Sequence, residues 1–263
     1  MLGVALIAIF VTVAILAPWL APYDPNEQGL GRSLEAPSAA HLAGLDKLGR
    51  DELSRVIYGA RISLLTGVVS VLMALVLGGV VGAAAGAVGG RLDNILMRVV
   101  DVFLAVPGIL LAIGIVAWLG QGLPQVMLAV AVANSPIFAR ILRGSLLASR
   151  EVDYVNAARS MGASRTRLLL RHMLPNSLTP LIVAATLTLA TAVIDVAGLG
   201  FLGLGPPDPQ TAEWGTMLTE AADLLRRAPW LIFAPGVAIT ISVIGFNLLG
   251  DGLRESLDPR LKR

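Results

Sequence analysis

The chain has 263 residues, of which 56% are hydrophobic and only 14% are charged. Soluble domains carry about 25% charged residues, so this composition excludes an ordinary soluble fold and favours a chain that lies in lipid. The formal net charge of +2 gives no reason to expect nucleic acid as a partner. Cysteine is absent, which excludes disulfides and thiol nucleophiles, and His41 and His172 are the only histidines, so we expect no metal site.

Six segments are apolar enough to cross a bilayer, which needs about 20 apolar residues per helix. In chain order they are residues 2–20, 62–88, 95–119, 124–142, 177–204 and 230–249. The first lacks the basic segment and the cleavage site of a signal peptide, so we expect it to be retained. Pro107 and Pro136 lie inside the third and fourth. The sequence therefore predicts an all-α fold, a polytopic membrane helix bundle of about six transmembrane helices.

The distribution of arginine predicts the orientation, because loops rich in Lys and Arg stay in the cytoplasm. Seven arginines fall between residues 140 and 172, which places that loop and both termini in the cytoplasm. Four parts follow, namely a first transmembrane helix (1–21), an extracytoplasmic loop (22–61), a core of five spans (62–250) and a cytoplasmic tail (251–263). At the end of the external loop, residues 51–62 are predicted to form an interfacial helix that leads into the second span.

The second span carries a row of glycines at intervals of four residues. These are Gly78, Gly82, Gly86 and Gly90. On a helix they share one face and let a neighbouring helix approach closely, so the row predicts helix packing, and a substrate-facing role is the alternative.

Three polar residues stand inside predicted spans. An acid in the middle of a membrane helix is costly and faces a cavity or a partner, so Asp195 either lines a translocation path or fixes a neighbouring helix. Asn134 has the same two interpretations at lower cost. Asp101 is one turn from Arg98, which predicts a local ion pair.

The loop between the fourth and fifth spans, about residues 143–176, has a pattern that a simple connection does not need. Asp153 is predicted to cap a short helix that ends at Gly162, where glycine suits a positive φ. Ser164 is predicted to cap a second short helix. Two amphipathic helices with a glycine break indicate a rigid docking element for a partner, whereas an inert basic anchor at the membrane surface is the alternative.

Motifs for catalysis are absent from the sequence. It has no Gly-Lys-Ser/Thr of a phosphate-binding loop, no His-Glu-x-x-His and no Gly-x-Ser-x-Gly. We therefore expect neither an enzyme nor a cofactor bound by this chain.

The docking loop resembles the Glu-Ala-Ala loop of bacterial ABC importer permeases. The matching residues are Asn156-Ala157-Ala158, then Gly162, then His172-Met173-Leu174-Pro175. Asn156 stands where the family usually has glutamate, which puts a salt bridge at that position in doubt. The resemblance assigns the coupling role to Asp153, Tyr154, Asn156, Ala157, Ala158, Met161, Gly162, Ala163, Arg167, His172, Leu174 and Pro175.

Three further blocks resemble the second permease subunit of dipeptide and oligopeptide importers, a family that also includes nickel transporters. They are residues 44–64, 201–218 and 247–260. Gly198 and Gly200 replace the small polar residues that usually precede the second block. Most members also carry a short basic segment before the first span, which this sequence does not have.

The resemblance implies a type I ABC importer permease core. It also implies a second homologous permease, two cytoplasmic ATPase subunits that bind ATP and Mg²⁺, and an extracytoplasmic substrate-binding protein. Relatives carry dipeptides, longer peptides, nickel chelates or other small solutes, and no segment of this chain selects among these. Two other functions remain open, an ion-coupled secondary transporter that uses Asp195 and a scaffold subunit that transports nothing.

Overall fold

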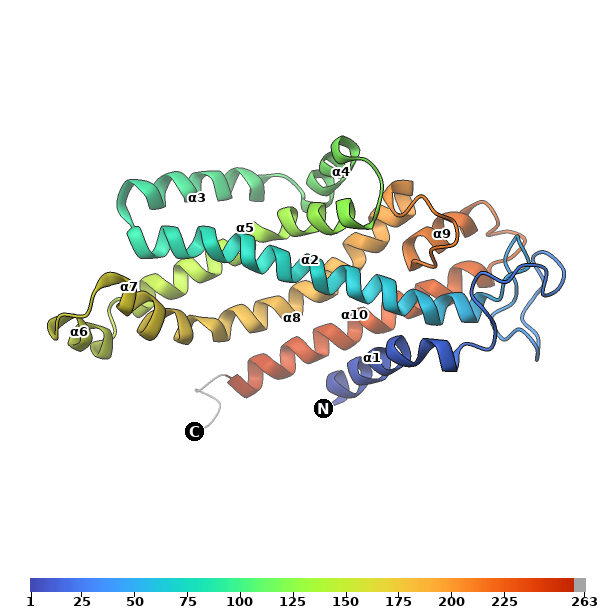
Figure 1. Ribbon diagram of the computed structural model, residues 1–263, viewed down its shortest axis with the longest axis horizontal. Coiled ribbons are helices and arrows are strands. Elements are labelled where there is room, and N and C mark those ends of the chain that lie inside the picture. Colours follow the sequence, from blue (N-terminus) through green and yellow to red (C-terminus); the bar gives the residue numbers. More distant parts are fainter. Residues whose placement is uncertain (258–263) are drawn as a thin grey trace.

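The computed structural model describes residues 1–257, and most of its helices run along one long axis (Figure 1). The helices are α1 (Leu2–Leu20), α2 (Glu52–Val88), α3 (Gly90–Ala105), α4 (Gly108–Leu119), α5 (Leu123–Ser149), α6 (Asp153–Ser160), α7 (Arg165–Arg167), α8 (Leu174–Leu199), α9 (Trp214–Ala222) and α10 (Trp230–Leu257). Two π-helical segments, η1 (Leu168–Met173) and η2 (Gly200–Leu204), flank α8.

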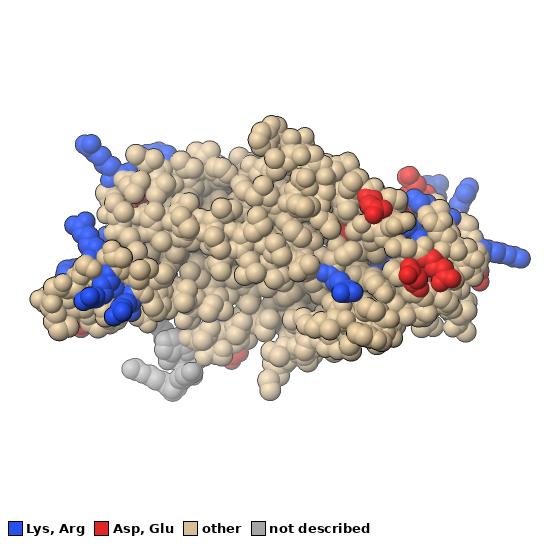
Figure 2. Space-filling view, viewed as in Figure 1, with Lys and Arg blue, Asp and Glu red and all other residues tan. Residues whose placement is uncertain are grey.

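Within the described residues, five helical segments are long and apolar enough to cross a membrane, and α3 with α4 makes a sixth if the bent pair counts as one span. The predicted bundle of about six spans is therefore confirmed. Charged side chains gather at the two ends of the visible face, and few lie between them (Figure 2). We call the region between the two ends the apolar belt, because the membrane-spanning segments cross it. We call the end that carries α6 and α7 the loop end, and the end that carries residues 21–51 and α9 the cap end.

The bundle is organised around α5 and α8. α2 packs along α5 and also contacts α8, α10 packs on α8, and α1 packs on α10 and α2. The contact between α2 and α5 is close because glycines face it: a Cβ at Gly82 would lie 2.5 Å from the carbonyl oxygen of Ala139, and one at Gly86 would lie 3.0 Å from Leu146. Gly78 also lies against α5. The inclusion of Gly90 in this row is wrong, because Gly90 begins α3 with a φ of 63° and open space around it.

α2 is one continuous helix of 37 residues. At about 1.5 Å per residue it is about 55 Å long, well beyond a hydrocarbon core of about 30 Å. The excess lies at the cap end, where the Asp51 side chain caps the helix by accepting from the amide of Ser54. Residues 51–62, expected as an interfacial helix that leads into the second span, are the cap and first turns of α2, continuous with that span.

The third predicted span, residues 95–119, is wrong as a continuous helix. α3 and α4 meet at an angle of 93°. Val106 is extended, with φ −92° and ψ 131°, because the residue before a proline is pushed out of the helical region. Pro107 then precedes α4 and lacks an N–H to continue the helix.

The ends of three other spans differ from the prediction. α5 continues to Ser149 rather than ending near residue 142, and Pro136 lies inside it without ending it. The fifth span begins inside a longer helical rod that starts at Arg165. α10 continues to Leu257, so the first part of the predicted tail is helical, and residues 258–263 lie outside the described residues.

Candidate functional site

At the loop end, α6 is fixed to the bundle by its inner face. Val155 is fully buried and Ala158 is 5% exposed, and both belong to the main apolar core. Leu168 and Met173, from η1, belong to the same core. The short helix therefore has an apolar anchor, although an isolated helix of eight residues would be unstable in water.

A glycine turn closes the far end of α6. Gly162 has a φ of 85°, its amide donates to the carbonyl of Arg159, and the amide of Ala163 donates to that of Ala158. These two bonds make a Schellman motif, which needs a residue that tolerates the left-handed region. The expected role of Gly162 as a helix terminator agrees with this geometry. Ala163 is partly buried and packs against the main apolar core.

A polar network joins the start of α6 to the start of α8. The hydroxyl of Tyr154 donates to the carbonyl of His172 over 3.1 Å. The amide of Asn176 donates to the Tyr154 oxygen at 2.7 Å and to the same carbonyl at 2.8 Å. The sequence had assigned Tyr154 and His172 to the loop but had missed Asn176, which lies one helical turn after His172.

The second half of the loop is continuous with the following span. Ser164 caps it, because its hydroxyl accepts from the amide of Arg167. From Arg165 the chain is helical through α7, η1 and α8, so the separate second short helix of the prediction is wrong. The π-helical turns precede Pro175, whose nitrogen cannot donate to the preceding turn. α6 is therefore attached to a single rod that crosses the bundle.

The outer face of α6 and its glycine turn is open. Met161 is 82% exposed, and Ala157 and Arg167 are exposed as well. Asn156 accepts a hydrogen bond from Arg159 at 3.1 Å. The predicted N-cap role of Asp153 is wrong, because Val152 holds that position and Asp153 lies in the first helical turn. Leu174 and Pro175 begin α8, with Leu174 half-buried against the core.

Arg143 of α5 and Arg150, the residue after α5, connect the loop end to two neighbouring helices, a feature that the sequence did not reveal. Arg143 donates to both carboxylate oxygens of Asp93 in α3, at 2.5 and 2.8 Å. Arg150 donates to the carbonyls of Gly86 and Ala87 at the end of α2, where a cation complements the helix dipole. The base of the loop is thus held by both α2 and α3.

The polar residues of the apolar belt form two separate contacts. Asn134 donates to the carbonyl of Val130 and, over 3.4 Å, to Asp195. Arg140 of α5 pairs with Asp101 of α3 at 2.5 Å. The predicted pair between Asp101 and Arg98 is therefore wrong, and the sequence missed Arg140 because α3 and α5 are distant in the chain.

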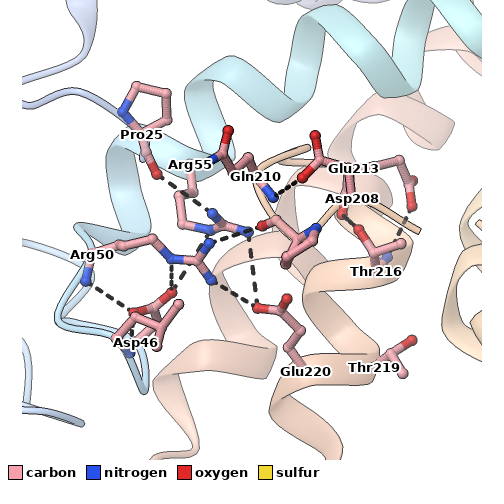
Figure 3. Close-up of polar contacts among 12 residues, drawn as sticks. Pro25, Asp46, Arg50, Arg55, Asp208, Gln210, Glu213, Thr216, Thr219 and Glu220 are labelled. Carbon is pink, nitrogen blue, oxygen red and sulfur yellow. Dashed lines mark hydrogen bonds and ion pairs between the residues drawn. The ribbon is translucent and has the colours of Figure 1, made fainter. Parts of the chain in front are cut away.

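At the cap end, a buried group of charges joins the segment before α2 to α9 (Figure 3). We call Asp46, Arg50, Arg55 and Glu220 the cap cluster. Arg50, whose side chain is 2% exposed, donates to Asp46 at 2.5 Å, to Glu220 at 3.0 Å and to the carbonyl of Pro209 at 2.9 Å. Arg55 lies 4.0 Å from Asp46 and 3.9 Å from Glu220. Buried charges need such pairing, so the cap is a firmly connected unit.

Glu213 ties the cap to α2. Its carboxylate accepts from the amides of Gly215 and Thr216, which caps α9, and from the hydroxyl of Ser63 at 3.2 Å. Burial raises the pKa of Glu213, and these hydrogen bonds oppose the rise. Trp214 is fully buried beside it and donates to the carbonyl of Val56.

The sequence matches the models of two known protein families. Residues 74–263 match the family described as binding-protein-dependent transport system inner membrane component. Residues 1–37 match the N-terminal TM domain of oligopeptide transport permease C. The first match alone covers well over half of the chain.

Curated relatives align over almost the whole chain. The di/tripeptide transport system permease protein DppC of Pseudomonas aeruginosa is 46% identical, over 99% of this chain and 88% of that protein. The glutathione transport system permease protein GsiD of Pectobacterium atrosepticum is 44% identical, over 97% and 85%. The MetNI methionine ABC transporter in an inward-facing conformation shares the fold, with a TM-score of 0.63 and 24% identity over 78% of this chain and 96% of that one.

Proposed function

We propose that this chain, which belongs to the family of inner membrane components of binding-protein-dependent transport systems, is one of two permease subunits of an ATP-driven importer for dipeptides or similar short peptides. The observation that carries the proposal is the rigid loop at the loop end. α6 presents an open face, while its inner face, its glycine turn and Tyr154 fix it to α8. An exposed surface on a rigid attachment suits docking to a partner that moves.

The loop would couple ATP hydrolysis to the bundle by moving as one piece. A cytoplasmic ATPase subunit that shifts the exposed tip at Met161 would move the rod formed by α7, η1 and α8, because helix continues without interruption from Arg165 to Leu199. Coupling of this kind needs a discrete element with two positions. Asn156 offers an amide to the ATPase, where a glutamate would offer a charge.

Each partner supplies what this chain lacks. Two ATPase subunits would bind ATP and Mg²⁺, a second homologous permease would complete the path, and an extracytoplasmic binding protein would deliver the solute. The chain itself would catalyse no reaction. It would lie in the bacterial cytoplasmic membrane, with the loop end and both termini in the cytoplasm, as the seven arginines of residues 140–172 favour.

Peptides are the favoured solutes because relatives named for di/tripeptide and glutathione transport align along nearly the full length. Asp195 and Asn134 are candidates for the wall of the path, since their contact places a carboxylate and an amide together within the apolar belt.

The test is uptake by vesicles that contain the assembled complex. We expect labelled dipeptide to accumulate only with internal ATP and external binding protein, and to continue when an ionophore collapses the proton gradient. Uptake without ATP that stops with the ionophore would instead support an ion-coupled transporter that uses Asp195.

A further inference from the structure

An ion pair lies open on the apolar belt. Asp101 and Arg140 contact each other at 2.5 Å, yet their side chains are 58% and 56% exposed. Asp101 is about 16 Å along α3 from its start at Gly90, and Arg140 is about 14 Å along α5 from its end at Ser149. Both residues therefore lie inside segments that are apolar enough to span a membrane, well away from the loop-end termini of their helices.

An exposed pair at this depth is costly against lipid. Ionisable residues within membrane helices face a water-filled cavity or a protein partner rather than hydrocarbon. The pair is not needed to attach α3, because Asp93 and Arg143 already join the same two helices through two hydrogen bonds. This second anchor is largely shielded, with side chains 10% and 31% exposed.

Arg140 belongs to a row of residues along one face of α5, which we call the α5 stripe. Ala133, Ile137, Arg140 and Gly144 follow one another at intervals of four, three and four residues, which is one face of a helix. Ile137 is 37% exposed, and Gly144 is exposed. The bend between α3 and α4 approaches the same stripe, since a Cβ at Gly108 would lie 4.0 Å from that of Ala133.

Another hollow of the bundle has a different character. A groove of about 510 Å³ between α2 and α8 is lined by aliphatic side chains, Gly79 and Thr186, without a charged residue. That groove suits acyl chains or an apolar helix. Of the two faces, the α3–α5 face is the one that offers fixed charges to a hydrated solute.

We propose that the α5 stripe lines the translocation path, and that Asp101 and Arg140 are the charges that a passing peptide contacts there. The proposal rests on the proposed import function and assigns two residues beyond Asp195 and Asn134. Opposite charges side by side can contact the ammonium and carboxylate ends of a short peptide without holding either strongly.

The natural absence of cysteine allows a direct test. Ile137→Cys places a thiol on the stripe, and Ile244→Cys places one on α10, where Ile244 is 46% exposed. Ile137 is about 18 Å from the end of its helix and Ile244 about 20 Å, so the two sites are matched in residue type and in distance from the helix end. Each variant is assembled with its partners in permeabilised membranes and treated with small charged thiol reagents.

We expect Ile137→Cys to react and dipeptide to slow the reaction, while Ile244→Cys stays unreactive. Adding Arg140→Gln leaves Asp101 unpaired, so the ratio of cationic to anionic labelling rates should rise about tenfold. An unreactive Ile137→Cys, or a ratio that does not change, overturns the proposal. ATP-driven uptake by the complex with the unmodified chain is measured separately, so that its absence would count against the proposed function and not against this assignment.

Discussion

Substitutions at Gly162 strain the backbone of the loop without a clash with any neighbouring side chain. Its φ of 85° lies in the left-handed region, and a Cβ built there would meet nothing within 4 Å. Gly162→Ala therefore adds only the cost of an L-residue in that region, about 1–2 kcal/mol. Gly162→Pro adds about 3 kcal/mol or more, because proline cannot adopt a positive φ and removes the amide that donates to Arg159.

These costs predict graded losses of coupling. A cost of 1–2 kcal/mol shifts a two-state equilibrium by about five- to thirtyfold, so Gly162→Ala should lower ATP-driven uptake by up to that factor, and Gly162→Pro should abolish it. Gly162→Asn should lose less, because asparagine tolerates the left-handed region. Gly252→Ala is the matched control, since Gly252 lies in α10 with open space around it and no positive φ.

The assay measures membrane insertion, recovery of the complex and uptake for all four variants. We expect insertion to be unchanged, because α5 and α8 are intact in each variant. Normal uptake by Gly162→Pro would refute the reasoning, since the loop could then lose its glycine turn and still transmit force.

Three further predictions concern stability in detergent. Gly82→Ala should lower the unfolding free energy by about 1–3 kcal/mol, because its Cβ would lie 2.5 Å from the Ala139 carbonyl, whereas Gly79→Ala, with nothing within 4 Å, should be close to neutral; equal melting of the two would contradict the packing role. Arg50→Ala should cost about 1–3 kcal/mol, because Asp46 and Glu220 lose the cation that is hydrogen-bonded to them and keep only Arg55 at 4.0 and 3.9 Å, and unchanged thermal stability would argue against the cap cluster. Glu213 binds a proton more tightly in the folded protein than in the unfolded protein, so the stability should fall as the pH rises from the ordinary pKa of 4.5 towards the raised value. Glu213→Gln should flatten that part of the pH profile. A Gln variant with an unchanged slope would show that another group causes the pH dependence.

The membrane spans and the glycine turn could be predicted because their signals are local. About 20 apolar residues in a row and a glycine after a short amphipathic helix depend only on neighbouring residues. Gly82 could be predicted as a packing residue for the same reason. Gly90 could not be excluded, because the four-residue spacing continues past the end of α2 at Val88.

The polar contacts between helices could not be predicted, because they depend on which helices are neighbours. Asp101 had Arg98 as its nearest cation along the chain, yet it pairs with Arg140 from α5. Glu220 lies 170 residues from Arg50. The sequence indicated that charges within an apolar chain need partners, and the fold decided which ones they have.

Backbone breaks were partly visible in the sequence. Pro107 and Pro136 both lie in apolar segments, and the sequence did not separate their effects. At Pro107 the chain turns by 93°, whereas α5 continues through Pro136, which is itself buried. Proline ends a helix where the neighbouring structure offers an alternative course and is tolerated where packing on both sides holds the helix together.

The central claim is that the tip of α6 docks on an ATPase subunit, and Met161 is the residue with which to test it. Met161→Cys, on a chain with no other cysteine, can carry a photoreactive thiol reagent at a position that is 82% exposed. Leu48→Cys is the control at the cap end, where Leu48 is 39% exposed. On illumination of the active complex in native membranes, we expect a cross-link from Met161→Cys to the ATPase subunit and none from Leu48→Cys. An active complex in which Met161→Cys never links to the ATPase would contradict the account.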